Sequence, residues 1–322
     1  MIGKTFETAM VLAAGYGERM RPLTSVLPKP ALPMPDGPVV ASALRLAASA
    51  GAIRIVVNVC HLAEQMAEAV ARVAINGVEI ELSFEDELMG TAGGLAMARD
   101  RGLLGDTGSV LVVNGDGALG LDLEGFAEHH LAHGDLVTLA LLPHLDPERW
   151  SRVLLDADER VLDIHPPGRP GRLEVPFLYP GVMAVRREAL DALPAIPGEI
   201  PASLWDPAQA GQRLGGLVVA GHWREIGTPT DYLEVSLLRL AGAAAIDPSA
   251  TVATDATLEN SFVGRDALVL DGATIEESVV AEGASVGRGA HVKRSVLLGA
   301  VEINPNEKIF GQILAGPSHA DS

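Results

Sequence analysis

The sequence has little cysteine, few aromatic residues and no long apolar segment. Cys60 is the only cysteine in 322 residues, which excludes an internal disulfide and suits a reducing compartment. Aromatic residues make up 4% and hydrophobic residues 48%, so we expect a core of Ala, Val, Leu and Ile. No apolar run reaches membrane-spanning length, and the N-terminus lacks the apolar stretch of a signal peptide. These absences predict a soluble, cytoplasmic protein without membrane insertion.

Positive charge is also scarce. The chain has 24 Lys and Arg against 42 Asp and Glu, giving a formal net charge of −18. Such a surface repels phosphate backbones, which argues against a nucleic-acid partner. Only Lys4, Lys29, Lys293 and Lys308 are lysines. A lysine fixed between two prolines, as Lys29 is, therefore attracts attention.

From residue 9 to about residue 240, apolar runs alternate with segments of helical periodicity. Residues 9–14, 53–59 and 109–113 predict buried strands. This alternation is typical of a mainly parallel sheet with helices on both faces. The expected fold class is therefore α/β, with a Rossmann-like mixed sheet. Ligands of such sheets bind at the carboxyl ends of the strands. Residues 143–201 are richer in proline and predict a lid or a second-substrate region.

After residue 240 the spacing of aliphatic residues changes to six, six and five. Ile246, Val263, Val280, Leu297 and Leu314 are consequently seventeen residues apart. One large aliphatic residue in each hexapeptide, with alanine four residues later, predicts a parallel β-helix of triangular cross-section. We expect about four coils of a left-handed β-helix. The expected domains are residues 1–242, residues 243–315 and a disordered tail at 316–322.

The stretch VLAAGYGERMRPLTSVLPKPALPM, residues 11–34, follows the first predicted strand. Met20 replaces the third glycine of the dinucleotide fingerprint, and no lysine follows Gly17 as an ATP loop requires. The glycines that remain let backbone N–H groups approach phosphate, and the two arginines supply fixed charge. Lys29 adds a point charge on a backbone stiffened by prolines. The stretch therefore predicts a phosphate-binding loop of another type.

Four motifs occur in order along the chain: AAGYGERMRPLT followed by PKP, GTAGGLAMARD, VVNGD and WREIGTPTDYLEV. Together they resemble the nucleotidyltransferases that join a sugar 1-phosphate to a nucleoside triphosphate. A hexapeptide solenoid follows, as in several members of that family, so the resemblance covers nearly the whole chain. It implies NDP-sugar and pyrophosphate as products, Mg²⁺ as cofactor, and an NTP and a sugar 1-phosphate as partners. Cell-envelope polysaccharide synthesis is the implied wider role.

The resemblance also implies a role for each matching residue. Arg19 would hold the departing β- and γ-phosphates. Lys29 would bridge the sugar phosphate and the α-phosphate under attack. The implied nucleotide-binding residues are Leu12, Ala13, Ala14, Gly15, Gly17, Gly90 and Thr91; the metal ligands are Asp116 and Glu225; and the sugar-binding residues are Gly115 and Gly181.

The implied chemistry agrees with what the sequence offers. The attacking phosphate is already ionised, so neither a general base nor a covalent nucleophile is needed. Positioning and charge neutralisation by Mg²⁺, Lys and Arg suffice. The sequence accordingly presents no Ser/His/Asp or Cys/His arrangement to compete with this interpretation.

Three departures keep a non-catalytic, NDP-sugar-binding sensor open as an alternative. Glu225 stands where many relatives have aspartate. The stretch Leu162–Gly171 lacks the lysine of the usual sugar-site motif, which leaves Arg169 or Arg172 for that charge. Gly117 stands in the metal loop where many relatives have an apolar residue, so we expect a looser loop.

The base and the sugar stay open. The opening loop is more similar to uridylyl and thymidylyl enzymes, including those acting on N-acetylmuramic acid 1-phosphate. GTAGGLAMARD is more similar to mannose 1-phosphate guanylyltransferases. His291 is the only histidine in the coils, so an acyltransferase activity of the solenoid is a minor alternative. A structural role in a homo-oligomer is expected instead.

Other chemically reactive side chains have plainer interpretations. His61, His129 and His130 are expected at helix ends or in solvent. His165 is a weaker candidate for substrate contact. Cys60 is expected in packing. Trp205 and Trp223 are likewise expected to pack rather than to stack on a base.

Overall fold

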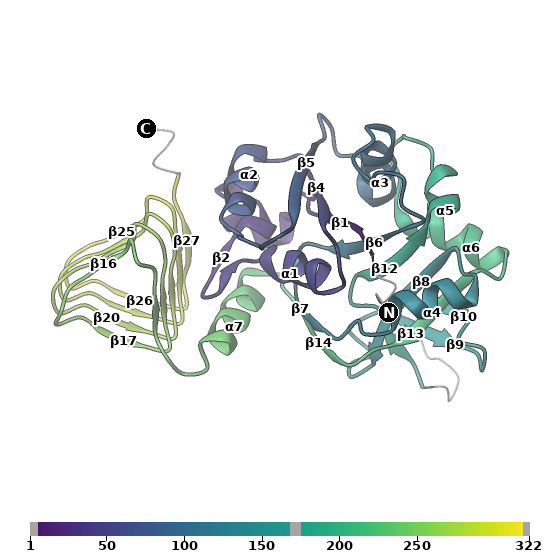
Figure 1. The fold of residues 1–322 in the computed structure, drawn as a ribbon. Helices are drawn as coiled ribbons and strands as arrows, with labels where there is room; N and C mark the ends of the chain where they lie inside the picture. The colour runs from purple at the N-terminus through teal and green to yellow at the C-terminus, as the bar shows by residue number, and fades with distance from the viewer. Residues whose placement is uncertain (1–5, 168–174, 318–322) are drawn as a thin grey trace. The chain divides into compact units, whose positions relative to one another are not determined.

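A computed structural model describes residues 6–167 and 175–317 (Figure 1). The predicted arginines Arg169 and Arg172, and the predicted tail from residue 318, lie outside the described residues. The chain forms two compact units, each treated separately below. The first unit comprises the residues up to Gly15, Ser42–Cys60 and Ala74–Trp223; the second comprises Tyr16–Ala41, His61–Val73 and the residues from Arg224.

The first unit is centred on one large mixed sheet. Its strands run in the order β10 (Val161–His165), β9 (Arg152–Leu155), β11 (Phe177–Leu178), β8 (Val137–Pro143), β12 (Val182–Arg186), β6 (Ser109–Asn114), β1 (Thr8–Leu12), β4 (Arg54–Val59) and β5 (Glu79–Phe84), with β13 (Leu214–Val218) also beside β8. Strands β6, β1, β4 and β5 are parallel. Strand β12 is antiparallel to both its neighbours, while β13 is parallel to β8. The carboxyl ends of β1, β4 and β6 therefore meet at one edge.

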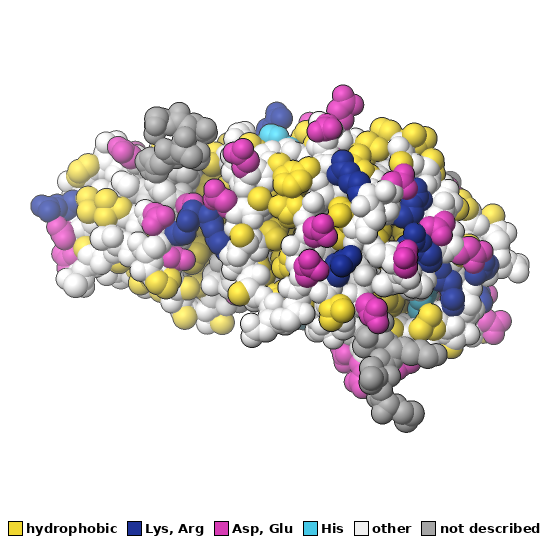
Figure 2. Space-filling model, turned by 45° about the horizontal axis from the view of Figure 1, so that its top comes forward, with side chains coloured by type: hydrophobic (Ala, Val, Ile, Leu, Met, Phe, Trp, Pro, Cys, Tyr) yellow, Lys and Arg dark blue, Asp and Glu magenta, His cyan; other side chains and the backbone are white. Residues whose placement is uncertain are grey.

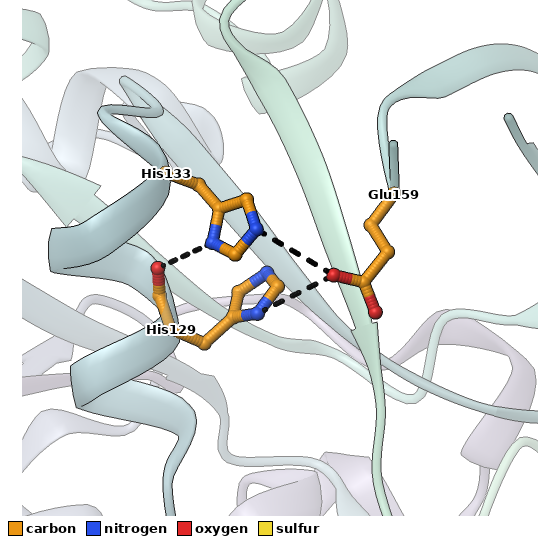
Figure 3. Close-up of side chains that lie close together, drawn as sticks. All are labelled: His129, His133 and Glu159. Carbon is orange, nitrogen blue, oxygen red and sulfur yellow. Dashed lines mark hydrogen bonds and ion pairs between the residues drawn. The ribbon is translucent and has the colours of Figure 1, made fainter. Parts of the chain in front are cut away.

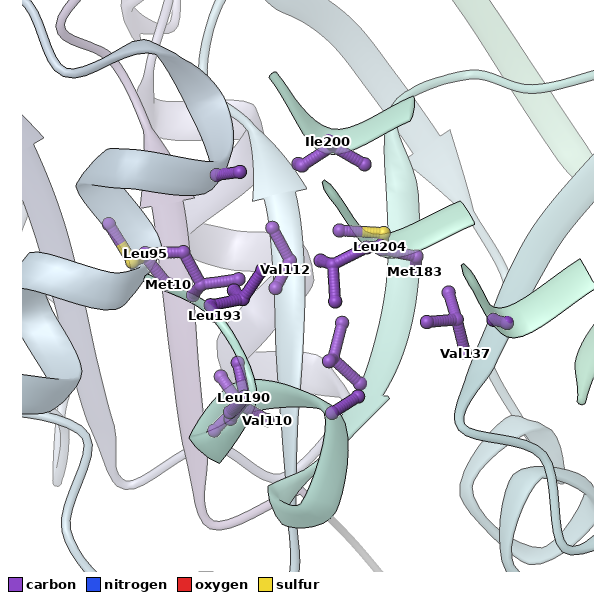
Figure 4. Close-up of a cluster of buried hydrophobic side chains, with 14 of the residues drawn as sticks. Met10, Leu95, Val110, Val112, Val137, Met183, Leu190, Leu193, Ile200 and Leu204 are labelled. Carbon is purple, nitrogen blue, oxygen red and sulfur yellow. The ribbon is translucent and has the colours of Figure 1, made fainter. Parts of the chain in front are cut away.

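The sheet is buried on both faces at β1, because the successive residues Ala9, Met10 and Val11 are all 0% exposed. On one face, Met10 packs in a cluster with Leu95 and Leu190 from two helices (Figure 4). The core is mostly Ala, Val, Leu and Ile, as the low aromatic content predicts. The helices of this unit are α1 (Ala41–Ser49), α3 (Gly90–Asp100), α4 (Phe126–His133), α5 (Arg187–Asp191), η4 (Pro201–Trp205) and α6 (Asp206–Ala210). A small additional sheet pairs β7 (Gly117–Leu121) with β14 (Gly221–Glu225).

The second unit contains the opening loop and the solenoid. The loop forms short helical turns and a hairpin because its prolines and glycines do not support longer elements. The last helix of the second unit, α7, starts at a capping box. The Thr228 side chain accepts from the Asp231 N–H group, and the Asp231 carboxylate accepts from the Thr228 N–H group. The elements are η1 (Glu18–Met20), η2 (Leu23–Ser25), η3 (Lys29–Ala31), β2 (Pro33–Met34), β3 (Gly37–Pro38), α2 (Ala63–Ala71) and α7 (Pro229–Leu240).

Residues 245–315 form three parallel sheets whose strands recur once per coil (Figure 1). Ile246 pairs with Val263 and Val263 with Val280, which confirms the predicted repeat of seventeen residues. The predicted fold class, an α/β sheet followed by a β-helix, is thus confirmed. The sheets consist of β15 (Ala245–Ile246), β18 (Phe262–Val263), β21 (Val279–Val280), β24 (Val296–Leu298) and β27 (Ile313–Ala315); of β16 (Thr251–Val252), β19 (Leu268–Val269), β22 (Ser285–Val286) and β25 (Glu302–Ile303); and of β17 (Thr257–Glu259), β20 (Thr274–Glu276), β23 (His291–Lys293) and β26 (Lys308–Phe310).

The short corner of each coil has a repeated construction. A residue with a positive φ, in the left-handed region, is followed by a fully buried serine. The Ser278 N–H group donates to Ser261 Oγ at 3.1 Å, and Ser278 Oγ accepts from the Ser295 N–H group at 3.0 Å. This ladder satisfies the backbone where the face is one residue shorter. The pairs are Asn260–Ser261, Glu277–Ser278 and Arg294–Ser295.

The surface carries charges of both signs. Figure 2 shows Lys and Arg side chains among Asp and Glu side chains on one face, with hydrophobic side chains between them. Acidic residues nevertheless outnumber basic ones, as the net charge of −18 requires. A membrane-spanning helix would need a longer and more apolar segment than any helix in the described chain.

Candidate active site

The predicted nucleotide-binding loop starts where β1 ends, at the carboxyl edge of the parallel strands. Ala13 and Ala14 are each 6% exposed, so their backbone is held close to the sheet. The Ala13 N–H group donates to Oδ1 of Asn58, near the end of the adjacent β4, at 2.8 Å. The loop therefore leaves the sheet in a direction that a neighbouring side chain fixes.

Asn58 belongs to a buried polar network that sequence reasoning missed. Its Nδ2 donates to Glu85 Oε1 at 2.7 Å, and the Met89 N–H group donates to Glu85 Oε2 at 2.9 Å. Asn58 and Glu85 are 3% and 5% exposed. A Cβ on Gly94 would lie 2.5 Å from Glu85 Oε1, so only glycine fits there. The network thus connects the nucleotide loop to the residue before Gly90.

Gly90 and Thr91 open α3 and hold the segment around residue 199. Gly90 has φ 69°, and a Cβ there would lie 2.6 Å from the Gly198 carbonyl oxygen. Thr91 Oγ1 donates to Glu199 Oε2 at 2.7 Å and accepts from the Ile200 N–H group at 2.9 Å. The Thr91 N–H group also donates to Glu199 Oε2, at 3.4 Å, so both its hydroxyl and its N–H group position this segment, which leaves Gly90 for a ligand.

Asp116 follows β6 at the same edge of the sheet. The Gly115 N–H group donates to the Leu12 carbonyl oxygen at 2.8 Å, and the Asn114 N–H group donates to that of Gly181 at 2.7 Å. Gly181 has φ 91°, and a Cβ there would lie 2.7 Å from the Asn114 side chain. The fold thus brings the predicted residues Leu12, Gly115 and Gly181 together, with an exposed Asp116 beside them.

Gly117 does not loosen this loop. It is buried and begins β7 directly after Asp116. Its carbonyl oxygen accepts from Ser42 Oγ at 2.9 Å. The expected looser loop is therefore wrong: a hydrogen bond and strand pairing hold this position.

In the second unit, Gly17 lies against Lys29. Gly17 has φ 62°, and a Cβ there would lie 2.9 Å from Thr24 Cγ2 and 3.2 Å from Lys29 Cβ. Thr24 Oγ1 donates to the Gly17 carbonyl oxygen at 3.0 Å. Lys29 begins η3 and is only 7% exposed. The second glycine of the loop is therefore needed where the lysine approaches it.

Arg19 and Glu225, which two distant motifs supply, form an ion pair in this unit. Arg19 Nη2 lies 3.2 Å from Glu225 Oε1, and the side chains are 71% and 23% exposed. Gly227 permits this approach, because a Cβ there would lie 2.8 Å from Glu225 Oε1. The pair joins positions 206 residues apart in sequence. The Arg19 side chain remains largely in solvent and can change rotamer at small cost.

A cavity of about 480 Å³ lies in the first unit, within or next to the proline-rich region. The rings of Trp150 and Trp223 meet edge to face at a centroid distance of 5.4 Å, and those of Tyr179 and Trp205 do so at 5.0 Å. The cavity has the size of a small-molecule site. Trp205 and Trp223 pack as predicted, but they also line this cavity.

The structure also describes the surroundings of His130 and Cys60, two side chains for which the sequence predicts no catalytic role. His130 lies in the last turn of α4, at a helix end as expected, but it is 0% exposed, and its ring nitrogens lie 3.1 Å from Ser109 Oγ and 2.7 Å from Thr138 Oγ1. Burial, then the Arg186 guanidinium and His129, lower the His130 pKa to about 4. Burial also raises the pKa of the Cys60 thiol, which keeps it protonated as a packing residue.

Comparison with known families identifies the class of protein. The model of the family described as nucleotidyl transferase matches residues 8–241. The model described as GlmU-like, C-terminal hexapeptide matches residues 244–314. The chain therefore belongs to the nucleotidyl transferase family, and the predicted class of enzyme, a nucleotidyltransferase, is confirmed.

Curated relatives carry one kind of name. A mannose-1-phosphate guanyltransferase of Schizosaccharomyces pombe is 28% identical over 263 residues, covering 76% of this chain and 72% of that protein. The catalytic subunit beta of the Drosophila melanogaster mannose-1-phosphate guanylyltransferase is 28% identical over 234 residues, covering 72% of this chain and 63% of that protein. The matched regions thus span roughly two thirds of these relatives' lengths.

Solved structures support the fold. The crystal structure of HddC from Yersinia pseudotuberculosis superimposes with a TM-score of 0.61, covering 72% of this chain and 98% of that one. The sequences are 19% identical, so this likeness concerns the fold alone.

Proposed function

We propose that this protein is a Mg²⁺-dependent sugar-1-phosphate nucleotidyltransferase. An oxygen of the sugar phosphate attacks the α-phosphorus of an NTP in line. The bond from the α-phosphorus to the bridging oxygen breaks, and its electron pair leaves with pyrophosphate. The observation that best supports this assignment is the pairing of Arg19 with Glu225, since two separate motifs predict them for one reaction.

Lys29 and Arg19 have different roles in the proposed mechanism. Lys29 bridges the two anions that must meet, and its ammonium group offsets their repulsion. A position 7% exposed between two prolines suits this role, because the charge is fixed before substrate arrives. Arg19 neutralises the charge that builds on pyrophosphate. Its 71% exposed side chain suits a contact that forms with the substrate and ends with product release.

The donor set fits Mg²⁺. Asp116 of the first unit is exposed, and Glu225 of the second unit is 23% exposed at its side chain, so each carboxylate is open to an ion together with water and phosphate oxygens. Glu225 accepts a hydrogen bond from Arg19 at 3.2 Å, so Arg19 must move from this oxygen before the ion can bind it. Bound Mg²⁺ would neutralise phosphate charge as a Lewis acid. The longer side chain of Glu225 distinguishes this chain from relatives with aspartate.

For the nucleotide, we propose that the backbone after β1 and at Gly90 lines the base, held by the Asn58–Glu85 network. For the sugar, we propose Gly115, Gly181 and the aromatic cavity. The names of the relatives favour GTP and mannose 1-phosphate as the pair to test first.

The experiment is a pyrophosphate-release assay with Mg²⁺. GTP, UTP, dTTP and ATP are each combined with the 1-phosphates of mannose, glucose and N-acetylglucosamine, and the NDP-sugar is identified by mass spectrometry. We expect turnover with GTP and mannose 1-phosphate and its loss with excess EDTA. No pyrophosphate from any pair, in a sample with a cooperative thermal transition, contradicts the proposal.

A second candidate is an NDP-sugar-binding protein without turnover. The contact that favours it is again Arg19 with Glu225, because this carboxylate is engaged by arginine at 3.2 Å. Thermal stabilisation by an NDP-sugar without pyrophosphate release would support this candidate. Stabilisation accompanied by turnover would exclude it.

We also propose residues 1–242 as the catalytic domain and residues 243–315 as a domain for assembly into a homo-oligomer. A cytoplasmic location belongs to the same proposal, since it fits a single cysteine and nucleotide substrates. We do not propose an acyltransferase role for His291, whose Nε2 lies 3.3 Å from Glu276 Oε1 on the solenoid.

A further inference from the structure

Three side chains of the first unit converge outside the proposed transferase residues (Figure 3). His129 Nδ1 lies 3.6 Å from Glu159 Oε2, and His133 Nε2 lies 3.7 Å from the same oxygen. The two imidazole rings stack with centroids 4.0 Å apart and planes at 25°. One potential ligand atom from each residue lies within 4.8 Å of the other two.

The local structure fixes these side chains. His129 and His133 are four residues apart on α4, so they project from one face of the helix. His133 Nδ1 lies 3.0 Å from the His129 carbonyl oxygen, which turns Nε2 toward Glu159. Glu159 has φ 60° in a turn closed by the Arg160 N–H group donating to Asp156 Oδ1 at 2.9 Å. The Gly216 N–H group donates to the Glu159 carbonyl oxygen at 2.9 Å and anchors the turn.

We propose that His129, His133 and Glu159 bind one divalent transition-metal ion of the Zn²⁺ type. Two imidazoles and one carboxylate, with a position left for water, form a known three-residue zinc ligand set. Zn–N and Zn–O bonds near 2.0–2.1 Å place tetrahedral donors roughly 3.3 Å apart. The His129 and His133 nitrogens lie 3.6 and 3.7 Å from Glu159 Oε2, close to this value. The ligand atoms of the two histidines lie within 4.8 Å of one another, so the stacked rings turn toward each other when they share the ion. Two histidines at i and i+4 on a helix are a spacing that zinc sites use.

The charges around the cluster allow a cation. The Arg160 guanidinium lies near the cluster, but it pairs with buried Asp135 and donates to the His133 carbonyl oxygen at 3.1 Å. The Asp135 carboxylate offsets part of its charge. Burial first, then His133, lower the His129 pKa, with Arg160 acting in the same direction and Glu159 opposing. Neutral imidazole is the form that binds a metal.

Access from solvent favours the same assignment. The His133 and Glu159 side chains are 38% and 45% exposed, so an ion can enter from solvent, while His129 is 10% exposed and is held in place by the surrounding residues.

The ion would connect the last turn of α4 to the turn between β9 and β10. It would act as a structural clamp within the first unit, apart from the Mg²⁺ of the proposed reaction. Nitrogen donors make the site selective, because Mg²⁺ prefers all-oxygen ligands. Binding to the folded state alone would raise stability with the logarithm of the free metal concentration once that concentration exceeds Kd.

The test uses the full chain after EDTA treatment and dialysis, titrated with Zn²⁺ by calorimetry at pH 7.5 in excess Mg²⁺. We expect one Zn²⁺ per chain and a rise in the thermal midpoint. His133→Gln and Glu159→Gln should each weaken binding at least tenfold and abolish the rise. His291→Gln is the matched control, because His291 also lies beside a carboxylate, Glu276 at 3.3 Å, and should change nothing.

Exposure of His133 and Glu159 lets both variants fold, which circular dichroism verifies. Absence of Zn²⁺ binding by the unsubstituted chain overturns the proposal. So does binding that both variants retain, because the metal then lies elsewhere. Loss in the two variants together with retention in His291→Gln supports it.

Discussion

Lys29 is the residue at which one substitution separates the proposed chemistry from folding. Lys29→Ala removes the charge that offsets repulsion between two phosphates. We expect kcat to fall by about 10²–10³, as for the loss of one preorganised electrostatic contact. Lys308→Ala removes an exposed lysine from the solenoid and should leave kcat unchanged. Both variants are measured by pyrophosphate release at saturating substrate.

Thermal unfolding of Lys29→Ala is the necessary control, because Lys29 is 7% exposed. A cooperative transition with full activity would show that the loop after β1 has been misassigned. A low kcat with a cooperative transition supports the phosphate role.

His130 gives a prediction about pH and stability. Its folded-state pKa of about 4 lies below the ordinary value of 6.5, so the unfolded chain binds the proton more readily. Stability should therefore fall as pH drops below 6.5, by about 2 kcal/mol between pH 7.5 and pH 5 from this group. Urea unfolding in EDTA at several pH values measures it.

His130→Asn removes this titration and should flatten the pH dependence by the same amount. His222→Asn, at an exposed position, should not. An unchanged slope in His130→Asn would mean that other groups, such as carboxylates, carry the acid sensitivity.

At the scale of elements, the Asn58–Glu85 network joins β1, β4 and the start of α3. Glu85→Gln keeps the size but places an amide donor against Asn58 Nδ2 or the Met89 N–H group. We expect the KM for NTP to rise about tenfold with a smaller change in kcat, because the base pocket shifts while the phosphate residues do not. Initial rates against NTP concentration test this.

Glu87→Gln is the control, because Glu87 is exposed on the same segment. A Glu85→Gln variant with an unchanged KM would restrict the network to a folding role. Equal loss of kcat and of kcat/KM would place its effect on the transition state instead.

The serine ladder is the second element-scale feature. Ser278→Ala removes the acceptor of the Ser295 N–H group and leaves this donor unsatisfied in a 0% exposed corner. We expect destabilisation of about 1–3 kcal/mol. Ser285→Ala, half-buried on β22 and outside the ladder, is the matched control. Equal urea midpoints for the two variants would contradict the ladder's role.

At the scale of the whole molecule, the elements that repeat regularly along the sequence could be predicted. Contacts between side chains of distant segments could not. The spacing of Ile246, Val263 and Val280 predicts the coils because each position stacks on its counterpart in the next coil. The alternation around residues 9–14 and 109–113 predicts the parallel strands for a similar reason: burial on both faces demands apolar runs.

Contacts between side chains from distant segments are harder to predict from the sequence. Asn58 could have been noticed as a polar residue in the apolar run IVVNV, but nothing nearby names Glu85 as its partner. Glu159 reaches two histidines of α4 only because its turn is closed by Asp156 and anchored at Gly216. Such contacts depend on tertiary geometry, which no local pattern specifies. That Arg19 and Glu225 belong to one site could be predicted only because the two motifs that contain them resemble those of a known family.

The last prediction concerns assembly of the full chain. Ile246 and Phe310 are 50% and 51% exposed on the solenoid, although Ile246 occupies a position that is fully buried in the second coil, at Val263. Incomplete stacking at an end of a coil array favours contact with another copy. We expect light scattering to give a multiple of 33.6 kDa. Phe310→Glu should shift the mass toward one chain, and Leu145→Glu, at a 90% exposed position of the first unit, should not. The measurement belongs at 0.15 M salt or more, because a net charge of −18 opposes association at low ionic strength. A single-chain mass at tens of micromolar would contradict the assembly role.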